Sequence, residues 1–309
     1  MSTPAPGAPQ DPGRPTARRL LLIVNPSAGG GRTTRTLPAV EAALAGWGAD
    51  VRIERTRDID HAEALVAESV ADARVPVAFG GDGLAGRVAG AAADAGILAA
   101  VLPGGRGNDF LRALGASRDP AQAAAALATA TERRLDLGMA NGRAFLGIAS
   151  LGFDSDVQVL ANRTRLPLGS QVYTYAALRT LSSWQHARFS VEVDGEARSV
   201  TGWSVAAANS PYYGGGMRYA PDASLDDGML DVVLAAATSR RRFLQMLPRV
   251  FSGRHVDDPH VEVLKAQRIT VDADRPFPVY ADGDPVAVLP VTLTVRPGAL
   301  RLLVEDAST

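Results

Sequence analysis

The chain has 309 residues, more than one domain usually contains, so two domains are expected. Its 32 basic and 33 acidic residues give a net charge of −1, and this balance provides no overall positive field for binding nucleic acid. The absence of cysteine excludes disulfides, zinc–thiolate sites and cysteine nucleophiles. The four histidines are scattered and lack HExxH spacing, so the sequence does not indicate a histidine metal site. It also has no GxxxxGKS/T motif, which argues against a P-loop NTPase.

The first 17 residues are rich in Pro, Gly, Ala and Thr and lack the apolar core of a signal peptide. This composition predicts a disordered tail, residues 1–17. No later run, including the alanine-rich residues 121–130, is apolar enough to span a bilayer. We therefore expect a cytoplasmic protein that is soluble or peripherally associated with a membrane.

The first predicted strand covers residues 18–24, a continuous apolar run suited to a strand that is buried on both faces. A glycine-rich turn, residues 25–32, follows it, and then a helical pattern through Leu37, Val40 and Leu44. Backbone N–H groups of such a turn can cradle phosphate, although a flexible connector explains the turn equally well when it is taken alone.

The next units are a half-buried strand at residues 51–56, a helix at residues 61–73 and an apolar strand at residues 75–79. That strand ends in Gly80-Gly81-Asp82-Gly83, and a helical pattern begins at Leu84. The glycines allow a ligand to approach the backbone, and the N-terminus of the helix attracts phosphate. Because a carboxylate repels phosphate, Asp82 is better suited to a metal ion or to hydroxyl groups.

A similar unit follows, with a strand at residues 97–102, a glycine-rich turn at residues 103–108, and helices at residues 109–114 and 121–131. The two turns lie about one βα unit apart, so they are expected at the same edge of a parallel sheet, where such sheets bind ligands. The alternation of strands and helices up to this point predicts a parallel sheet with helices on both faces.

After residues 134–138 the pattern changes to short strands separated by turns, and only residues 171–183 and 240–251 are predicted as helices. The second half is therefore predicted to be mainly antiparallel β. We expect an α/β nucleotide-binding domain at residues 18–138 and a β domain at residues 139–290. A C-terminal strand region, residues 291–309, is expected to follow, and whether it returns to the N-terminal domain is left open at this stage.

Taken together, the turns and several later motifs resemble the diacylglycerol kinase catalytic family, which includes sphingosine and ceramide kinases and bacterial lipid kinases. In chain order the motifs are Asn25-Pro26, Gly80-Gly81-Asp82-Gly83, Pro103-Gly-Gly-Arg-Gly-Asn-Asp-Phe110, Asp136-Leu-Gly138, Ser150-Leu-Gly-Phe-Asp154, Asn209, Gly214-Gly-Gly216, residues 221–231 and Asp282-Gly283-Asp284. The Gly-Gly-Asp-Gly turn also occurs in NAD kinases, so it identifies only a superfamily, whereas the later motifs point to the lipid branch.

The resemblance implies a Rossmann-like, phosphofructokinase-like nucleotide domain, a C-terminal antiparallel β-sandwich that carries the acceptor site, and ATP with Mg²⁺ in the cleft between them. It implies phosphorylation of a lipid hydroxyl at a membrane surface, with diacylglycerol as the default acceptor, and it is compatible with a homodimer. Asp282 matches the catalytic base of the family, with Asp284 beside it. On its own, Asp282-Gly283 would be interpreted as an ordinary hairpin turn.

The resemblance also assigns binding residues. For the nucleotide these are Asn25, Thr56, Gly80, Gly81, Asp82, Gly83, Gly104, Gly105, Arg106 and Asn108. Asp82, Asp109 and Asp136 would lie near Mg²⁺, directly or through water, although Asp109 also suits a helix N-terminus and Asp136 a loop. A structural cation would be bound by the backbone carbonyls of Ser224 and Met229 and by the Asp227 side chain, in a turn that also suits a simple strand connection.

The chain departs from the family pattern after the first motif. Many relatives have Thr at position 84 and Asn-Glu at positions 86 and 87, whereas this chain has Leu84, Gly86 and Arg87, and it has Arg106 where relatives often have Thr. We hypothesise that Arg106 and Arg87 replace the lost polar contacts to ATP, against the alternative that they are solvated.

Two other functions stay open at this stage. One is an NAD kinase or another small-molecule kinase, and the other is a nucleotide-binding regulator that has lost turnover. The segment at residues 239–251 mixes arginines with large apolar residues, as helices at a membrane surface do, although an ordinary amphipathic helix packed against its own sheet is the preferred explanation.

Overall fold

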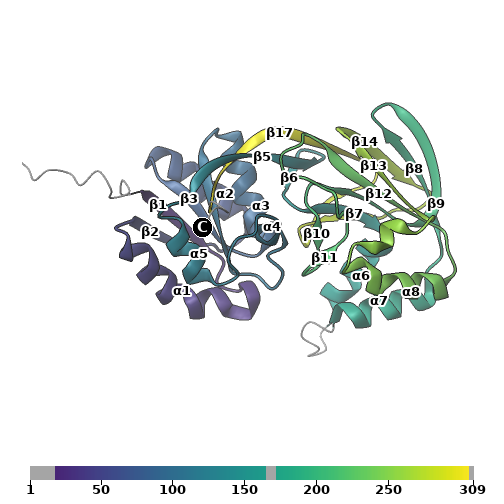
Figure 1. The fold of residues 1–309 in the computed structure, drawn as a ribbon, viewed down its shortest axis with the longest axis horizontal. Coiled ribbons are helices and arrows are strands. Elements are labelled where there is room, and N and C mark those ends of the chain that lie inside the picture. Colours follow the sequence, from purple (N-terminus) through teal and green to yellow (C-terminus); the bar gives the residue numbers. More distant parts are fainter. Residues whose placement is uncertain (1–17, 165–171, 306–309) are drawn as a thin grey trace, which may run out of the picture.

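The computed structural model describes residues 18–164 and 172–305, so the predicted tail and residues 306–309 lie outside the described residues. An N-terminal α/β domain and a C-terminal antiparallel β domain lie side by side, and two long strands connect them (Figure 1). These strands are β5 (Thr131–Ala140) and β17 (Val291–Val304). The predicted fold class is confirmed.

The N-terminal domain is built on four parallel strands in the order β2-β1-β3-β4. The strands are β1 (Arg19–Val24), β2 (Asp50–Arg55), β3 (Val75–Gly80) and β4 (Leu98–Pro103), and the helices are α1 (Ala28–Gly46), α2 (Ile59–Ala71), α3 (Asp82–Asp94), α4 (Asp109–Ala113) and α5 (Pro120–Ala126). Leu20 and Leu22 of β1 pack with α1 and α5, whereas Leu21 and Ile23 pack with α2 and α3. Because both faces are covered, β1 is apolar at nearly every position.

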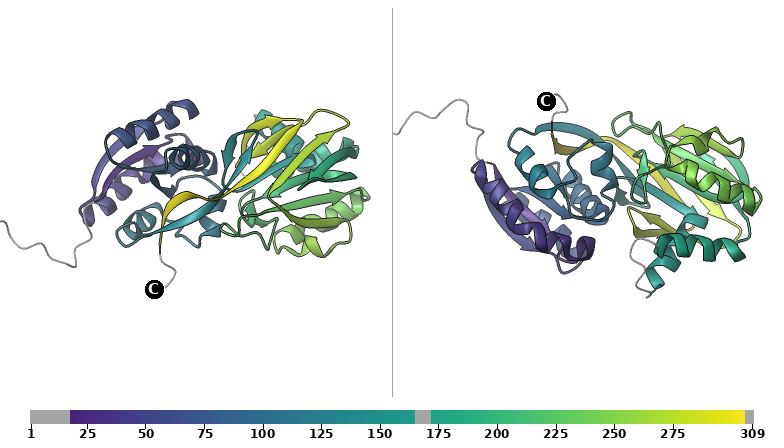
Figure 2. Two further views of the ribbon diagram at one scale, coloured as in Figure 1. Left: turned by 90° about the horizontal axis from the view of Figure 1, so that it is seen from above. Right: turned by 60° about the horizontal axis from the view of Figure 1, so that its bottom comes forward.

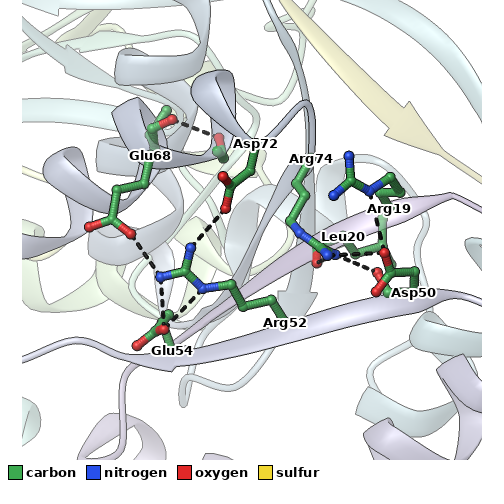
Figure 3. A network of polar contacts seen from close by, with 10 residues as sticks. Arg19, Leu20, Asp50, Arg52, Glu54, Glu68, Asp72 and Arg74 are labelled. Atoms are coloured by element: carbon green, nitrogen blue, oxygen red, sulfur yellow. Dashed lines mark hydrogen bonds and ion pairs between the residues drawn. The ribbon is translucent and has the colours of Figure 1, made fainter.

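The outer edge of this sheet is held by ion pairs on the surface (Figure 3). Arg52 of β2 contacts Glu68 and Asp72 of α2 at 2.8 and 2.9 Å, and Arg74 contacts Asp50 at 3.0 Å. Most of these side chains are a third to a half exposed, so the pairs add little to the free energy of unfolding. Arg52 thereby contacts the C-terminal half of α2 from β2.

The C-terminal domain is organised around β9, which pairs in antiparallel fashion with β7, β8 and β12. Its strands are β6 (Arg143–Phe145), β7 (Ile148–Gly152), β8 (Ala187–Val193), β9 (Glu196–Ala208), β10 (Tyr212–Tyr213), β11 (Met217–Arg218), β12 (Leu230–Ala236), β13 (Val261–Ala266), β14 (Arg268–Ala273), β15 (Pro278–Ala281) and β16 (Asp284–Val288). A short 3₁₀ helix covers Arg254–Asp257.

Three helices gather on one side of this domain: α6 (Phe153–Arg163), α7 (Val172–Ser183) and α8 (Arg240–Val250) (Figures 1 and 2). Phe153 packs edge-on against Trp203 of β9 with a centroid distance of 5.6 Å, and Phe243 of α8 stacks on the same ring at 4.1 Å. These aromatic contacts attach the helices to the sheet. None of the described helices is both long and apolar enough to cross a lipid bilayer.

Strand β17 joins the two domains through backbone hydrogen bonds, and Figure 2 shows its course from one body to the other. It pairs with β14 in the C-terminal domain, with β5 from Leu293 to Val304, and in parallel with β4 at Arg301 and Leu302. The expected domain boundary after residue 138 therefore falls inside β5. A continuous sheet, rather than a flexible linker, sets how the two domains face each other.

The sequence patterns missed one helix and predicted another helix too long. Helix α6 was not predicted, because its polar and β-branched residues give a weak helical pattern, and its buried Phe153 in the aromatic core stabilises it instead. Helix α5 ends at Ala126 rather than at residue 131, since Thr131 already pairs with Val304 as the first residue of β5. Helix α7 is described from Val172, so the expected start at residue 171 lies outside the described residues.

Candidate functional site

Two glycine turns are packed directly against each other at the carboxyl ends of β3 and β4. The N–H of Gly104 donates to the carbonyl of Gly80 over 2.7 Å. A Cβ atom at Gly104 would lie 2.9 Å from the Cα of Gly80, and one at Gly105 would lie 2.6 Å from the Cα of Gly81. Only glycine allows this approach, so the two motifs form one closely packed unit in which Gly80, Gly104 and Gly105 are buried and residues 81–83 are partly exposed.

The first glycine-rich turn completes this surface from the end of β1. Gly29 has a φ of +58°, and a Cβ atom there would lie 2.6 Å from the carbonyl oxygen of Gly104. Asn25 donates its N–H to the carbonyl of Phe79, and Thr56 donates its N–H to the carbonyl of Val24. Asn25 and Thr56 therefore lie at neighbouring strand ends, with Asn25 beside Gly80, and their contact with a nucleotide stays a prediction.

Asn108 shapes the second turn. It adopts a left-handed φ of +50°, accepts a hydrogen bond from the N–H of Gly105 at 2.9 Å, and returns one to the carbonyl of the same residue at 3.1 Å. Its side chain is buried, so its contacts hold the turn in place. By contrast, Arg106 is exposed and forms no hydrogen bond or ion pair within the described residues, which leaves its guanidinium available to a phosphate.

The family departures at positions 84 and 87 have local explanations. Leu84 is buried in the core and packs against Gly80, so it replaces a hydroxyl with apolar contact. Arg87 forms an ion pair with Glu63 at 3.3 Å. Burial raises the pKa of Asp284, and the charge of Arg87 opposes this rise. The structure therefore gives the two hypothesised arginines different surroundings, with only Arg106 unpaired in the part of the chain described.

Asp82 and Asp109 form a carboxylate pair next to the glycines. Asp82 accepts hydrogen bonds from the N–H groups of Asp109 and Phe110 at 3.2 and 3.3 Å. Burial and the neighbouring Asp109 raise the pKa of Asp82, and burial raises the pKa of Asp109. Asp109 accepts the N–H of Gly215 at 2.6 Å, but its Oδ1 is buried without a hydrogen-bond partner among the described residues.

This carboxylate pair fits a cation that also binds a ligand. Within residues 18–164 and 172–305 there is no group of three or more acidic, histidine or cysteine residues that could hold a metal ion alone. Mg²⁺, however, usually takes one or two carboxylates and completes its shell with water and the phosphates of a nucleotide. Oδ1 of Asp109 has no hydrogen-bond partner among the described residues, although it lies 3.6 Å from Nε of Arg112. Asp82 and Asp109 therefore fit as the one or two carboxylates of such a site, and a bound cation would favour their ionised forms.

The late acidic pair lies against the same place, in the turn between β15 and β16. A Cβ atom at Gly86 would lie 3.1 Å from Oδ2 of Asp282, and one at Gly83 would overlap Oδ2 of Asp284. The hairpin of the C-terminal domain is therefore packed on the first turn of α3. Two motifs that are about 200 residues apart in the sequence meet at one site, and Gly86 supplies the space for Asp282.

The Asp282 carboxylate is fixed by two backbone donors that the sequence did not reveal. It accepts the N–H of Leu146 at 2.7 Å and the N–H of Gly147 at 2.8 Å, both from the connection between β6 and β7. A Cβ atom at Gly147 would lie 2.6 Å from Oδ1 of Asp282, so this position also needs glycine. The sequence signal for these donors was Gly147 between two apolar residues, a pattern that is too common to identify a functional position.

The environment of Asp282 suits a general base. Burial and the nearby charges of Asp82 and Asp284 raise its pKa to about 7, against the two backbone hydrogen bonds, which lower it. Burial also raises the pKa of Asp284. A base with a pKa close to the working pH transfers protons efficiently in both directions.

Asp136 lies in different surroundings from the other predicted magnesium ligands. Its carboxylate accepts the N–H of Gly228 at 2.6 Å and the N–H of Gly298 at 2.7 Å, and its side chain is buried. Both oxygens therefore connect β5 to the turn before β12 and to β17. No described contact links Asp136 to Asp82.

The turn predicted to bind a structural cation contains an internal charge partner. Oδ1 of Asp227 accepts the N–H of Met229 at 3.0 Å, and its Oδ2 accepts the ammonium of Lys265 at 2.6 Å. The hydroxyl of Ser224 donates to Asp226 at 2.7 Å. The three predicted residues do come together in one turn, but a lysine to which the sequence assigned no role occupies the second oxygen of Asp227.

The contact between Gly83 and the hairpin gives a first prediction. In Gly83→Ala the new methyl group meets the Asp284 carboxylate, so this carboxylate must move away from α3. We expect kcat for phosphoryl transfer to fall about 10²-fold, the usual effect of displacing a catalytic group by about 1 Å. Gly46→Ala, in open space at the end of α1, is the matched control and should retain full activity. Full activity in Gly83→Ala would show that the hairpin does not act at this position.

Comparison with known proteins places the chain in a family. Residues 19–140 match the model described as "Diacylglycerol kinase catalytic domain", and residues 147–304 match the "YegS C-terminal NAD kinase beta sandwich-like domain". A Mycobacterium tuberculosis protein named "Diacylglycerol kinase" is 32% identical over 92% of this chain and 94% of its own length. A Pseudomonas fluorescens protein named "Probable lipid kinase YegS-like" is 32% identical over 94% and 97%.

Solved structures show the same fold. The crystal structure of a diacylglycerol kinase from Bacillus anthracis str. Sterne superposes with a TM-score of 0.74 at 24% identity, covering 94% of this chain and 99% of that one. The two domain models, the relatives aligned over nearly their full length and the shared fold all agree with the order of motifs from Asn25 to Asp284. The chain therefore belongs to the diacylglycerol kinase catalytic family of lipid kinases.

Proposed function

We propose that this protein transfers the γ-phosphate of ATP to a lipid hydroxyl, and that its acceptor is diacylglycerol, which gives phosphatidic acid. The observation that carries the proposal is the position of Asp282. This carboxylate, with a pKa of about 7, comes from the C-terminal domain and lies against the first turn of α3, beside the glycine turns of the N-terminal domain. A base and a surface that suits phosphate meet there.

The N-terminal domain is proposed to bind the nucleotide. Residues 81–83 are partly exposed at the N-terminus of α3, where backbone N–H groups without an intrahelical partner and the helix dipole both suit phosphate oxygens. The N–H groups of Gly104 and Gly105 are bonded to Gly80 and Asn108, so the second turn supports the first. The unpaired guanidinium of Arg106 supplies further donors. Mg²⁺, held by Asp82 and Asp109, would neutralise charge on the β- and γ-phosphates.

Asp282 is proposed to act on the acceptor. As the hydroxyl oxygen of the lipid forms its bond to the γ-phosphorus, the bond from phosphorus to the β-phosphate oxygen breaks and ADP leaves. The hydroxyl proton passes to the Asp282 carboxylate, whose position is fixed by the N–H groups of Leu146 and Gly147. Asp284 lies two residues away and raises the pKa of this base.

A surface of the C-terminal domain suits contact with an anionic membrane. Five of the eight large hydrophobic side chains that are exposed in the described part of the chain lie on α7, on α8 or directly after α8. They are Tyr173, Tyr175, Leu178, Leu244 and Phe251. The two helices also carry five arginines and no acidic residue. Cationic and apolar side chains on one face are typical of helices that bind at the surface of a bilayer.

The membrane surface gives a second prediction. Leu178→Ser/Phe251→Ser removes two side chains that are 53% and 61% exposed, so the fold should be retained. We expect binding to vesicles containing phosphatidylglycerol to fall about tenfold or more, since each buried apolar side chain contributes about 1.5–3 kcal/mol. Co-sedimentation measures the effect. Val70→Ser, which removes an exposed side chain of α2, is the control, and equal binding by both variants would rule out this surface.

Transfer of labelled phosphate from ATP tests the proposed reaction. The acceptors are diacylglycerol, monoacylglycerol, a sphingoid base and NAD, each with Mg²⁺. Product from diacylglycerol in preference to the others supports the proposal. Product from NAD alone would identify a small-molecule kinase, and bound ATP without any product would identify a regulator.

A further inference from the structure

Lys265 is the only lysine among 309 residues, and it lies at the turn predicted to hold a structural cation. It belongs to β13 and is directly opposite Asp231 of β12 in the antiparallel pair. Its ammonium is 2.6 Å from Oδ2 of Asp227 and 3.3 Å from Oδ2 of Asp231. One lysine therefore bridges two carboxylates.

The four aspartates at residues 222–231 require a nearby positive charge. Asp222, Asp226, Asp227 and Asp231 lie within ten residues of one another, and Arg133 pairs with Asp226. Asp231 is 3% exposed, and a buried carboxylate without a partner strongly disfavours folding. Lys265 lies opposite Asp231 with its Nζ 3.3 Å from Oδ2, so the ammonium acts as the counterion of this carboxylate.

A divalent cation does not fit beside this ammonium. Met229 already donates its N–H to Oδ1 of Asp227, and Lys265 occupies Oδ2. A metal ion on the same carboxylate would have to displace the lysine or lie next to a second positive charge. Either arrangement removes the electrostatic gain that makes Asp227 a good ligand.

We infer that the Lys265 ammonium takes the place of a structural divalent cation in this turn, so that the chain carries its own permanent cation. The turn is connected to the rest of the molecule through Gly228, whose N–H donates to Asp136 of β5, and Asp136 also accepts from Gly298 of β17. The lysine therefore supports the contact between this turn and the two strands that join the domains. This support does not depend on the concentration of free Mg²⁺.

Thermal unfolding without nucleotide tests the inference and is independent of the proposed reaction. The wild-type protein should have the same Tm in EDTA and in Mg²⁺. Lys265→Met keeps the length of the side chain but removes the charge, and its Tm in EDTA should fall by about 3 °C or more. Mg²⁺ should then raise the Tm of Lys265→Met, since the vacated carboxylates can bind it. The double variant Lys265→Met/Asp227→Asn should lose this response.

Two results would overturn the inference. One is a wild-type Tm that rises with Mg²⁺ and loses the rise in Asp227→Asn, which would place a metal ion in the turn beside Lys265. The other is a Lys265→Met variant with unchanged Tm and no response to Mg²⁺. If Lys265→Met does not fold, titration of the wild-type protein with Mn²⁺, followed by electron paramagnetic resonance and compared with Asp227→Asn, decides the question. Binding that is unaffected by Asp227→Asn supports the inference, and binding that depends on Asp227 contradicts it.

Discussion

Asp282→Asn should reduce kcat for phosphoryl transfer by about 10²–10⁴-fold, the usual contribution of a general base, while the KM for ATP changes little. The amide has nearly the shape of the carboxylate but cannot accept the hydroxyl proton at neutral pH. It also places an NH₂ group against one of the two backbone donors, Leu146 or Gly147, so one hydrogen bond is lost. The proposed ATP contacts come from the other domain and should stay in place.

The measurement is the initial rate with saturating ATP and lipid, beside the Kd for ATP and the Tm of each variant. Asp272→Asn is the matched control, because it removes the same charge from an exposed position of β14. Its activity should equal that of the wild-type protein. If Asp282→Asn retained more than about a tenth of the wild-type kcat with normal ATP binding, Asp282 would not be the base.

Much of the N-terminal half was predictable because its signals are local. An apolar run that ends in glycines, as at Gly80-Gly81, identifies a buried strand and the turn after it, and the parallel order of strands then brings the turns together. The structure shows Gly80 against Gly104 and Gly81 against Gly105, a contact that follows from this topology. Residues whose role depends on the backbone next to them in sequence could be identified in this way.

The remaining features depend on contacts between distant segments. The donors of Leu146 and Gly147 act on a residue more than 130 positions away, and no local pattern distinguishes them from other residues of a short strand connection. Helix α6 is stabilised by its position on the aromatic core rather than by its own helical pattern. Lys265 was visible as the single lysine, but only the pairing of β12 with β13 shows which acids it contacts.

The activity should also depend on pH in a direction that the site determines. Asp282 is a carboxyl whose pKa is raised from 3.8 to about 7, so at pH 5 nearly all of it is protonated and unable to accept a proton. We expect kcat/KM to rise with pH and to level off above about 8. Below pH 7 it should fall about tenfold per unit, giving about a hundredfold loss at pH 5.

Asp284→Asn tests whether the fall of kcat/KM below pH 7, the acidic limb of the profile, comes from the ionisation of Asp282. The charge of Asp284 raises the pKa of Asp282, so removing it should move the limb to lower pH, whatever happens to the plateau rate. The profile is measured from pH 5 to 9 at constant ionic strength, with Asp272→Asn as a variant that should show no shift. A limb near pH 4 would mean that Asp282 is already ionised throughout the working range. Activity that falls as the pH rises from 5 to 7 would require the protonated form, and Asp282 would then be an acid rather than a base.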